Sequence, residues 1–248
     1  MFGLFKKKQV KKERTLDYSP ILVDMHSHVL PGIDDGAQTP EESIVLIKKM
    51  MELGIKKVIA TPHVMADYYR NDRDSIMNAL AVLKEELKNQ NIDIPVEAAA
   101  EHYFDETFER RIDEGTLMTM GEEKYVLFEL SFINEPPNVI QMVQKMRDAG
   151  YKPILAHPER YAYMGVDRMR AIRSWGCAMQ LNTISLTGYY GKQTQKIAEE
   201  MVDEQIVDFM SSDMHHPRHA QAFEDALTTD YIEKLLVESY PLKNKLLF

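Results

Sequence analysis

The sequence predicts an α/β fold in which parallel strands form a closed or nearly closed barrel. Three observations support this prediction. Short apolar runs alternate with helical patterns along most of the chain. The runs are nearly continuous in apolar residues, which is expected when both faces of a sheet are covered. The length of 248 residues is normal for one α/β barrel, and an open doubly wound sheet is the alternative.

The predicted strands are short apolar runs bounded by polar or turn-forming residues. They lie at residues 21–25, 57–61, 94–100, 125–130, 153–156, 178–182 and 207–211. Because a helical pattern separates each run from the next, we expect parallel strands joined by helices.

The first predicted helix has clear signals at both ends. Thr39 can cap its N-terminus, Pro40 suits the first helical position, and Glu42 completes a Thr-x-x-Glu capping box. Apolar residues recur at helical spacing over 44–51, and Gly54 ends the helix. Further helices are predicted at residues 73–89, 105–114, 137–149, 167–174, 192–204, 217–227 and 230–239.

The composition is that of a globular protein, with 44% hydrophobic and 28% charged residues. The formal net charge of −9 argues against a nucleic acid as a partner of the whole surface. Cys177 is the only cysteine, so an intramolecular disulfide is impossible and a reducing, cytoplasmic compartment is expected.

The N-terminus is basic. Six Lys or Arg residues and one Glu lie within the first 14 positions, after an apolar start that does not match a secretory signal. We interpret residues 1–20 as a basic tail and residues 21–248 as one domain. The tail is either disordered or a weak tether to an anionic membrane face or to an acidic partner. No apolar run approaches the length of a membrane span.

Chemically capable side chains recur at the C-terminal ends of the predicted strands. In a barrel of parallel strands these ends meet on one face, where active sites are built. The residues concerned are Asp24, His26, His28, His63, Glu101, His102, Glu129, His157, Asn182, Asp213 and His215.

Each of these signals is weak alone. The alternating His26 and His28 point the same way on an extended backbone, but they are equally compatible with a satisfied polar strand end. Glu129 lies in an apolar run, where it needs either a metal ion or an Arg or Lys partner. Their recurrence at nearly every strand end favours metal binding. Histidine and carboxylate ligands without thiolate suit Zn, Mn or Fe, and their number exceeds what one ion takes.

Other phosphatase and nucleotide-binding mechanisms do not fit. A cysteine phosphatase needs Arg six residues after its Cys, but Thr183 stands at that spacing from Cys177. Asp24 is followed by Met and His, which excludes an Asp-x-Asp-x-Thr motif. No Gly-x-Ser-x-Gly elbow is present, and residues 188–192 do not form a P-loop.

An ordered set of motifs resembles the PHP (polymerase and histidinol phosphatase) superfamily. More closely, it resembles the bacterial capsular-polysaccharide protein-tyrosine phosphatases of the CpsB/YwqE type. The motifs are Asp24-Met-His26-Ser-His28, Pro31-Gly-Ile-Asp34-Asp35-Gly36, Ala60-Thr-Pro-His63, Ala156-His157-Pro-Glu-Arg160-Tyr161 and Ser212-Asp213-Met-His215. The resemblance runs from about Asp24 to near the C-terminus.

This resemblance implies a distorted, TIM-like (β/α)7 barrel with three divalent metal ions, often manganese. The implied metal ligands are His26, His28, Asp35, His63, Glu101, Glu129, His157, Asp213 and His215. Arg160, Asp213 and His215 would be catalytic, and Arg160 would bind the substrate phosphate with Arg218 as a second contact. Asp24 would orient a ligand histidine. The implied substrate is a phosphotyrosine protein, namely a tyrosine autokinase of capsular or exopolysaccharide synthesis.

A charge count agrees with this chemistry. Four ligand carboxylates carry about −4 and three divalent ions about +6, which leaves about +2 for a phosphate dianion. The segment 67–70 could pack a substrate tyrosine ring or could be a solvated loop. Two alternative functions are a small-molecule phosphatase of the histidinol-phosphate type and a non-catalytic metal-binding interaction module.

Overall fold

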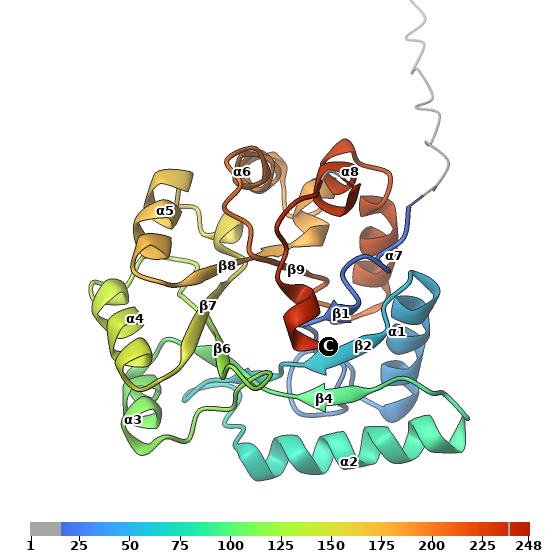
Figure 1. The fold of residues 1–248 in the computed structure, drawn as a ribbon. Coiled ribbons are helices and arrows are strands. Elements are labelled where there is room, and N and C mark those ends of the chain that lie inside the picture. The colour runs from blue at the N-terminus through green and yellow to red at the C-terminus, as the bar shows by residue number, and fades with distance from the viewer. Residues whose placement is uncertain (1–15, 238) are drawn as a thin grey trace, which may run out of the picture.

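The strands of the computed structural model form a ring with helices around its outside (Figure 1). The structure describes residues 16–237 and 239–248. One sheet has the order β1-β2-β4 and the other the order β3-β5-β6-β7-β8-β9, and every pairing is parallel. The strands are β1 (Val23–Asp24), β2 (Lys57–Ala60), β3 (His63–Val64), β4 (Val96–Ala98), β5 (Glu101–Tyr103), β6 (Tyr125–Glu129), β7 (Lys152–Ala156), β8 (Ala178–Asn182) and β9 (Phe209–Ser211).

The two sheets join into one barrel. Strands β3 and β5 continue β2 and β4 after breaks of two residues, so seven extended runs make up the wall. The last run meets the first, because Ser27 and Met214 form a parallel bridge. The His28 N–H donates to the Met214 carbonyl and the Asp213 N–H to the His26 carbonyl, both at 2.9 Å. The predicted closed barrel is therefore confirmed, and the open sheet is excluded.

Helices connect the strands and cover the outside of the ring. They are α1 (Pro40–Glu52), α2 (Arg73–Asn89), α3 (Glu106–Glu114), α4 (Val139–Asp148), α5 (Val166–Ser174), α6 (Lys192–Asp203), α7 (Pro217–Ala226) and α8 (Asp230–Val237). Three short 3₁₀ turns are η1 (Pro158–Arg160), η2 (Thr183–Thr187) and η3 (Asn244–Leu247).

The start of α1 shows the predicted cap in a modified form. The Thr39 hydroxyl accepts a hydrogen bond from the Glu42 N–H. The Glu42 carboxylate, however, accepts a hydrogen bond from the Gln38 N–H and not from the Thr39 N–H. The predicted capping box was therefore wrong, because the carboxylate binds the residue before the N-cap. Gly54 follows the helix end with φ 103°, and a Cβ there would lie 2.8 Å from the Ser19 nitrogen. Only glycine fits this position without strain.

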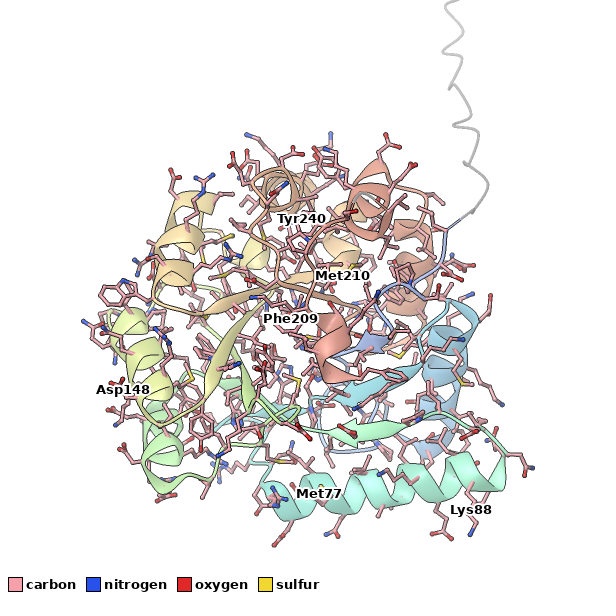
Figure 2. The ribbon with its side chains drawn as sticks, in the orientation of Figure 1. Met77, Lys88, Asp148, Phe209, Met210 and Tyr240 are labelled. Atoms are coloured by element: carbon pink, nitrogen blue, oxygen red, sulfur yellow. The ribbon has the colours of Figure 1, made fainter. Side chains whose placement is uncertain are left out.

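Two hydrophobic clusters lie on the two faces of the barrel wall. Phe209 belongs to a cluster with Val23, Leu127 and Ile154, whereas its neighbour Met210 packs in the larger cluster that includes the helices. The alternation follows from the two-residue period of a strand. Figure 2 shows both residues near the middle of the molecule, whereas Met77 and Lys88 lie on α2 at its edge.

The C-terminal turn η3 lies across the middle of the ring in Figure 1. Its Asn244 is fully buried. The Asn244 amide donates to the carbonyls of Val23, at 3.0 Å, and Met210, at 2.7 Å, and accepts from the Met210 N–H at 3.1 Å. Leu247 packs in the same cluster as Phe209. The turn thus joins β1 to β9 at the end of the barrel opposite the strand-end histidines.

The N-terminal part of the described chain packs on α7. Tyr18 is buried, its ring stacks on that of Phe223 at 3.9 Å, and its hydroxyl donates to the Phe223 carbonyl. Residues 16–20 of the predicted tail therefore belong to the folded body, and residues 1–15 lie outside the described residues. Over the described ranges, no helix has both the length and the apolar character needed to cross a membrane.

Asn244→Ala removes three buried hydrogen bonds and leaves backbone groups of two strands unpaired. We expect the free energy of unfolding to fall by about 2–4 kcal/mol. Urea denaturation followed by circular dichroism measures this change. Asn89→Ala, on the exposed side of α2, is the control and should alter stability by less than about 0.5 kcal/mol. Equal stability of Asn244→Ala and the wild type would contradict a stabilising role for the turn.

Candidate metal centre

The nine side chains predicted as metal ligands converge at one end of the barrel. Their nitrogen and oxygen atoms form four groups, within each of which all ligand atoms lie within 4.8 Å of one another. The groups are His28, Asp35, His63 and His215; His26, His157 and Asp213; His26, His28 and Glu101; and His63, Glu101 and Glu129. Shared members make them one continuous cluster.

The strand ends explain this convergence. His26 and His28 follow β1 with one residue between them, and their Nε2 atoms lie 3.3 Å apart. His157 follows β7 and Asp213 follows β9, with φ values of 32° and 50°. This left-handed backbone is strained for residues other than glycine and is typical of functional sites.

The loop that carries Asp35 depends on a close backbone approach. A Cβ at Gly36 would lie 2.0 Å from the His28 carbonyl oxygen, so only glycine fits there. The Ala37 N–H donates to the same carbonyl at 3.0 Å. This contact fixes the loop against β1 and keeps the Asp35 carboxylate 3.5 Å from nitrogens of His63 and His215.

Glu101 shows most clearly that the cluster suits cations. Its Oε2 lies 3.3 Å from His26 Nε2, 3.4 Å from His28 Nε2 and 3.1 Å from His63 Nδ1. The atom is buried, yet none of these contacts has hydrogen-bond geometry. A buried carboxylate oxygen without a hydrogen bond is costly. Here imidazole nitrogens and a carboxylate oxygen face one another. Their lone pairs could together coordinate one divalent ion.

Three of the imidazoles are oriented through their Nδ1 atoms. The Nδ1 of His28 lies 2.8 Å from Asp34 Oδ2, that of His26 lies 3.1 Å from Gln180 Oε1, and that of His215 lies 2.8 Å from the Asp213 carbonyl. An N–H donated at Nδ1 leaves the Nε2 lone pair free to face the cluster.

Asp34 and Gln180 were not predicted as site residues. Asp34 stands beside Asp35 in the motif that carries the resemblance, and only Asp35 was assigned as a metal ligand. Gln180 is a polar residue inside an apolar strand run, which is a usable but weak signal. Its carbonyl oxygen also accepts from the His157 N–H at 3.1 Å, so one side chain positions two histidines.

Asp24 supports His26 through the backbone of that residue. Its carboxylate accepts from the N–H groups of His26, at 3.4 Å, and Ser212, at 3.1 Å, and from the Ser212 hydroxyl. Burial raises the pKa of Asp24 to about 6, against these hydrogen bonds. Since no hydrogen bond to an imidazole is found for it within the described chain, it orients the backbone between β1 and β9 and not a ligand ring.

Glu129 lies among imidazoles. Its Oε1 is 3.1 Å from His63 Nδ1 and its Oε2 is 3.9 Å from His157 Nε2. Over residues 16–237 and 239–248, no Arg or Lys forms an ion pair with it. Among the described residues, the alternative of a structural Arg or Lys partner is therefore excluded.

Burial and the neighbouring opposite charges shift the pKa values of the cluster residues in opposite directions. Burial disfavours a charged imidazole, but the Glu101 carboxylate raises the pKa of His63 to about 9. Burial likewise opposes ionisation of Glu101, yet His26 and His63 hold its pKa well below the usual range. Protons on such imidazoles therefore offset part of the carboxylate charge in the absence of metal, and a metal ion has to displace them.

A cavity of about 560 Å³ lies over the cluster. Arg160 is the only Arg or Lys that lines it in the described part of the chain. Its guanidinium lies 4.9 Å from the Phe132 ring and 4.4 Å from the Tyr190 ring, and its Nη1 donates to Asp213 Oδ2 at 2.8 Å. Arginine suits phosphate because its planar group presents several N–H donors.

Glu159 fixes the turn that carries Arg160. Its Oε1 accepts from the Asn182 N–H at 3.0 Å and from the Ser185 hydroxyl at 2.8 Å. The side chain is buried, and this burial raises its pKa to about 7. The turn η1 is thereby tied to the turn after β8.

Two further predictions concern residues near the mouth. Arg218 is exposed on α7 and is not among the residues that line the cavity. Within the segment 67–70, Tyr68 is 79% exposed and does not line the cavity. Its neighbour Tyr69 does, with its ring stacked 5.4 Å from that of His63. Sequence reasoning also missed Phe132 and Tyr190, since aromatic residues in loops carry no distinctive signal.

Residues 22–244 match the model of the family described as capsular polysaccharide synthesis, CpsB/CapC. The chain is 29% identical over 197 residues to tyrosine-protein phosphatase YwqE of Bacillus subtilis, covering 79% of this chain and 78% of that protein. It is 24% identical over 230 residues to tyrosine-protein phosphatase CpsB of Streptococcus pneumoniae, covering 88% and 95%.

The fold is also similar to solved structures. One, from a study of YwqE from Bacillus subtilis and CpsB from Streptococcus pneumoniae, described as unique metal-dependent tyrosine phosphatases, superposes with a TM-score of 0.78 at 27% identity. The match covers 91% of this chain and 93% of that one. A mutant organophosphorus hydrolase from Deinococcus radiodurans has a TM-score of 0.51 at 14% identity, which supports the barrel fold alone.

Metal affinity should fall as the pH is lowered. Because the pKa of His63 is raised to about 9, its proton stays bound below that pH and metal binding must release it. For each displaced proton we expect affinity for Mn²⁺ to fall about tenfold per pH unit between roughly pH 8.5 and 6.5. Calorimetric titrations in buffers of different ionisation enthalpy measure both affinity and proton release. Affinity independent of pH would contradict this account.

Proposed function

The chain belongs to the CpsB/CapC family of capsular polysaccharide synthesis, and we propose that it is a metal-dependent protein-tyrosine phosphatase. The observation that carries this proposal is the cluster of five imidazoles and four carboxylates, most of them buried, beneath a cavity that contains Arg160. The tyrosine phosphatases among its relatives support the substrate class.

We assign three divalent ions to the cluster, with manganese as the first choice and iron or zinc as alternatives. The ligands would be His26, His28, Asp35, His63, Glu101, Glu129, His157, Asp213 and His215. The overlapping groups of donors support more than one ion, and imidazoles with carboxylates suit these metals. When bound, such ions lower the pKa of water and stabilise phosphoryl oxygens as Lewis acids.

Arg160 would bind the substrate phosphate. Asp213 holds one end of the guanidinium through Nη1, and the rings of Phe132 and Tyr190 fix its plane. The remaining N–H donors can then meet the phosphoryl oxygens without a costly reorientation. Asp213 and His215 would complete the catalytic set. His215 is oriented by its Nδ1 contact with the Asp213 carbonyl.

The aromatic lining of the cavity favours an aryl phosphate. Tyr69, Tyr103, Phe132 and Tyr190 all line it, so a phosphorylated tyrosine ring would be surrounded by rings. A phenolate with a pKa near 10 is a fairly good leaving group, so strong acid catalysis is not essential. A metabolite phosphatase of the histidinol-phosphate type gains no comparable support from this lining. A non-catalytic module would not need the complete donor set.

The proposed physiological substrate is a tyrosine autokinase of capsular or exopolysaccharide synthesis. The description of the family supports the link to polysaccharide synthesis. A cytoplasmic location stays a prediction. So does a weak membrane contact through the N-terminal tail, most of which lies outside the described residues.

His28→Ala and Asp213→Ala should each lower hydrolysis of a phosphotyrosine peptide by about a thousandfold or more. Both side chains would hold metal ions, so elemental analysis should show a lower metal content while circular dichroism shows a folded protein. Asp93→Asn, an exposed carboxylate away from the cavity, is the control. Normal turnover in either alanine variant, or full wild-type activity after treatment with a chelator, would refute the proposal.

Arg160→Lys keeps the positive charge but loses the plane that packs between Phe132 and Tyr190. We expect kcat/KM for the peptide to fall by about tenfold or more, since lysine cannot replace the fork of N–H donors. The metal content should not change. Steady-state kinetics and elemental analysis on the same preparation test this, and kinetics equal to those of the wild type would contradict the phosphate-binding role.

A further inference from the structure

The loop after β6 rises from the cluster to the mouth of the cavity. Glu129, the last residue of β6, is 3% exposed, Phe132 is 44% exposed and Ile133 is 90% exposed. Ser131, Phe132 and Ile133 all line the cavity. Ile133 therefore stands at its outer rim, on the same short stretch of chain as a member of the buried cluster.

This loop is anchored at its start by hydrogen bonds to two tyrosines. The Leu130 N–H donates to the Tyr161 hydroxyl at 2.9 Å, and the Tyr163 hydroxyl donates to the Ser131 carbonyl at 2.6 Å. Farther along, Glu135 pairs with Arg168. Ile133 is thus presented by a fixed segment. A single exposed isoleucine is ordinary on a protein surface. Ile133, however, also lines the cavity, so a substrate that fills the cavity and extends past its rim would contact it.

Phe132 already has partners within the molecule. Its ring lies 4.9 Å from the Arg160 guanidinium and 5.7 Å from the His157 ring. An aryl phosphate held by Arg160 would meet Phe132 and Tyr190, which flank that guanidinium. Ile133 lies beyond them at the rim. A group that covers Ile133 must therefore belong to a part of the substrate outside the phosphorylated ring.

We propose that Ile133 is a specificity-determining residue that contacts an aliphatic side chain next to the phosphotyrosine of a substrate polypeptide. This inference rests on the proposed phosphatase function. The contact removes apolar surface from water on both partners, so it favours polypeptides with an aliphatic neighbour over those with glycine there. The cluster and Arg160 select the phosphate, and Ile133 selects the surrounding sequence.

The test uses two phosphotyrosine peptides that differ only at the neighbouring positions, with leucine in one and glycine in the other. The metal-loaded wild type should show a KM roughly tenfold lower for the leucine peptide, as expected for burial of one aliphatic side chain, with similar kcat. Ile133→Ser should abolish this preference by raising the KM of the leucine peptide to that of the glycine peptide. Val82→Ser, which alters a half-exposed valine on α2, should keep the preference.

The outcomes separate this inference from the function on which it rests. Hydrolysis of both peptides by the wild type, with the same preference in Ile133→Ser, would overturn the role of Ile133 and leave the phosphatase function intact. An equal loss of the preference in Val82→Ser would also overturn it. Failure of the wild type to hydrolyse either peptide would overturn the proposed function itself, and the inference with it.

Discussion

The burial of carboxylates together with imidazoles at one end of the barrel is the constraint on which the structure depends. Glu101 lies inside the protein with three imidazole nitrogens within 3.4 Å of one oxygen. An isolated buried charge of this kind would be prohibitive. The opposite charges offset part of the cost, which explains why the pKa of Glu101 is held down while that of His63 is raised. Divalent ions would offset it more fully.

The first and last strands of the barrel are joined by different contacts at its two ends. At the cluster, backbone hydrogen bonds between the His26–His28 and Asp213–Met214 segments close the ring, and Asp24 reinforces them. At the opposite end, Asn244 joins the same two strands and the C-terminal turn covers the interior. Between them lies an apolar layer that includes Leu127 and Ile154. The proposed ligands, apart from Asp35, are therefore mounted at strand ends, which is what a preorganised site requires.

An acidic protein that acts on an anion needs a local source of positive charge. The chain has a net charge of −9, and the cluster itself contributes four carboxylates. Arg160 alone, paired with Asp213, could not attract a phosphate dianion to such a cavity. The proposed ions would thus serve substrate binding as well as catalysis. The aromatic rings around Arg160 keep its guanidinium oriented beside the cluster.

Much of the fold and of the candidate site could be predicted from local patterns. The predicted helix at 73–89 coincides with α2 (Arg73–Asn89), and the seven predicted strands all exist. The first is shorter than predicted because Leu22 has φ 65°, which is incompatible with a strand. Eight of the nine proposed ligand positions lie at or beside strand ends, and the C-terminal ends of parallel strands in a barrel share a face. Asp35 lies in the loop after β1, and its assignment came from the family resemblance alone.

The sequence by itself therefore determined the alternation of elements, the barrel and the residue types gathered at its mouth, because each is encoded in hydrophobic period and position along a strand. Only the tertiary structure decided how those residues are supported. Asp34 and Gln180, not Asp24, orient imidazoles, and Tyr69 rather than Tyr68 lines the cavity. These contacts depend on the paths of loops and on the approach of segments that are distant in the sequence. No local sequence pattern encodes them.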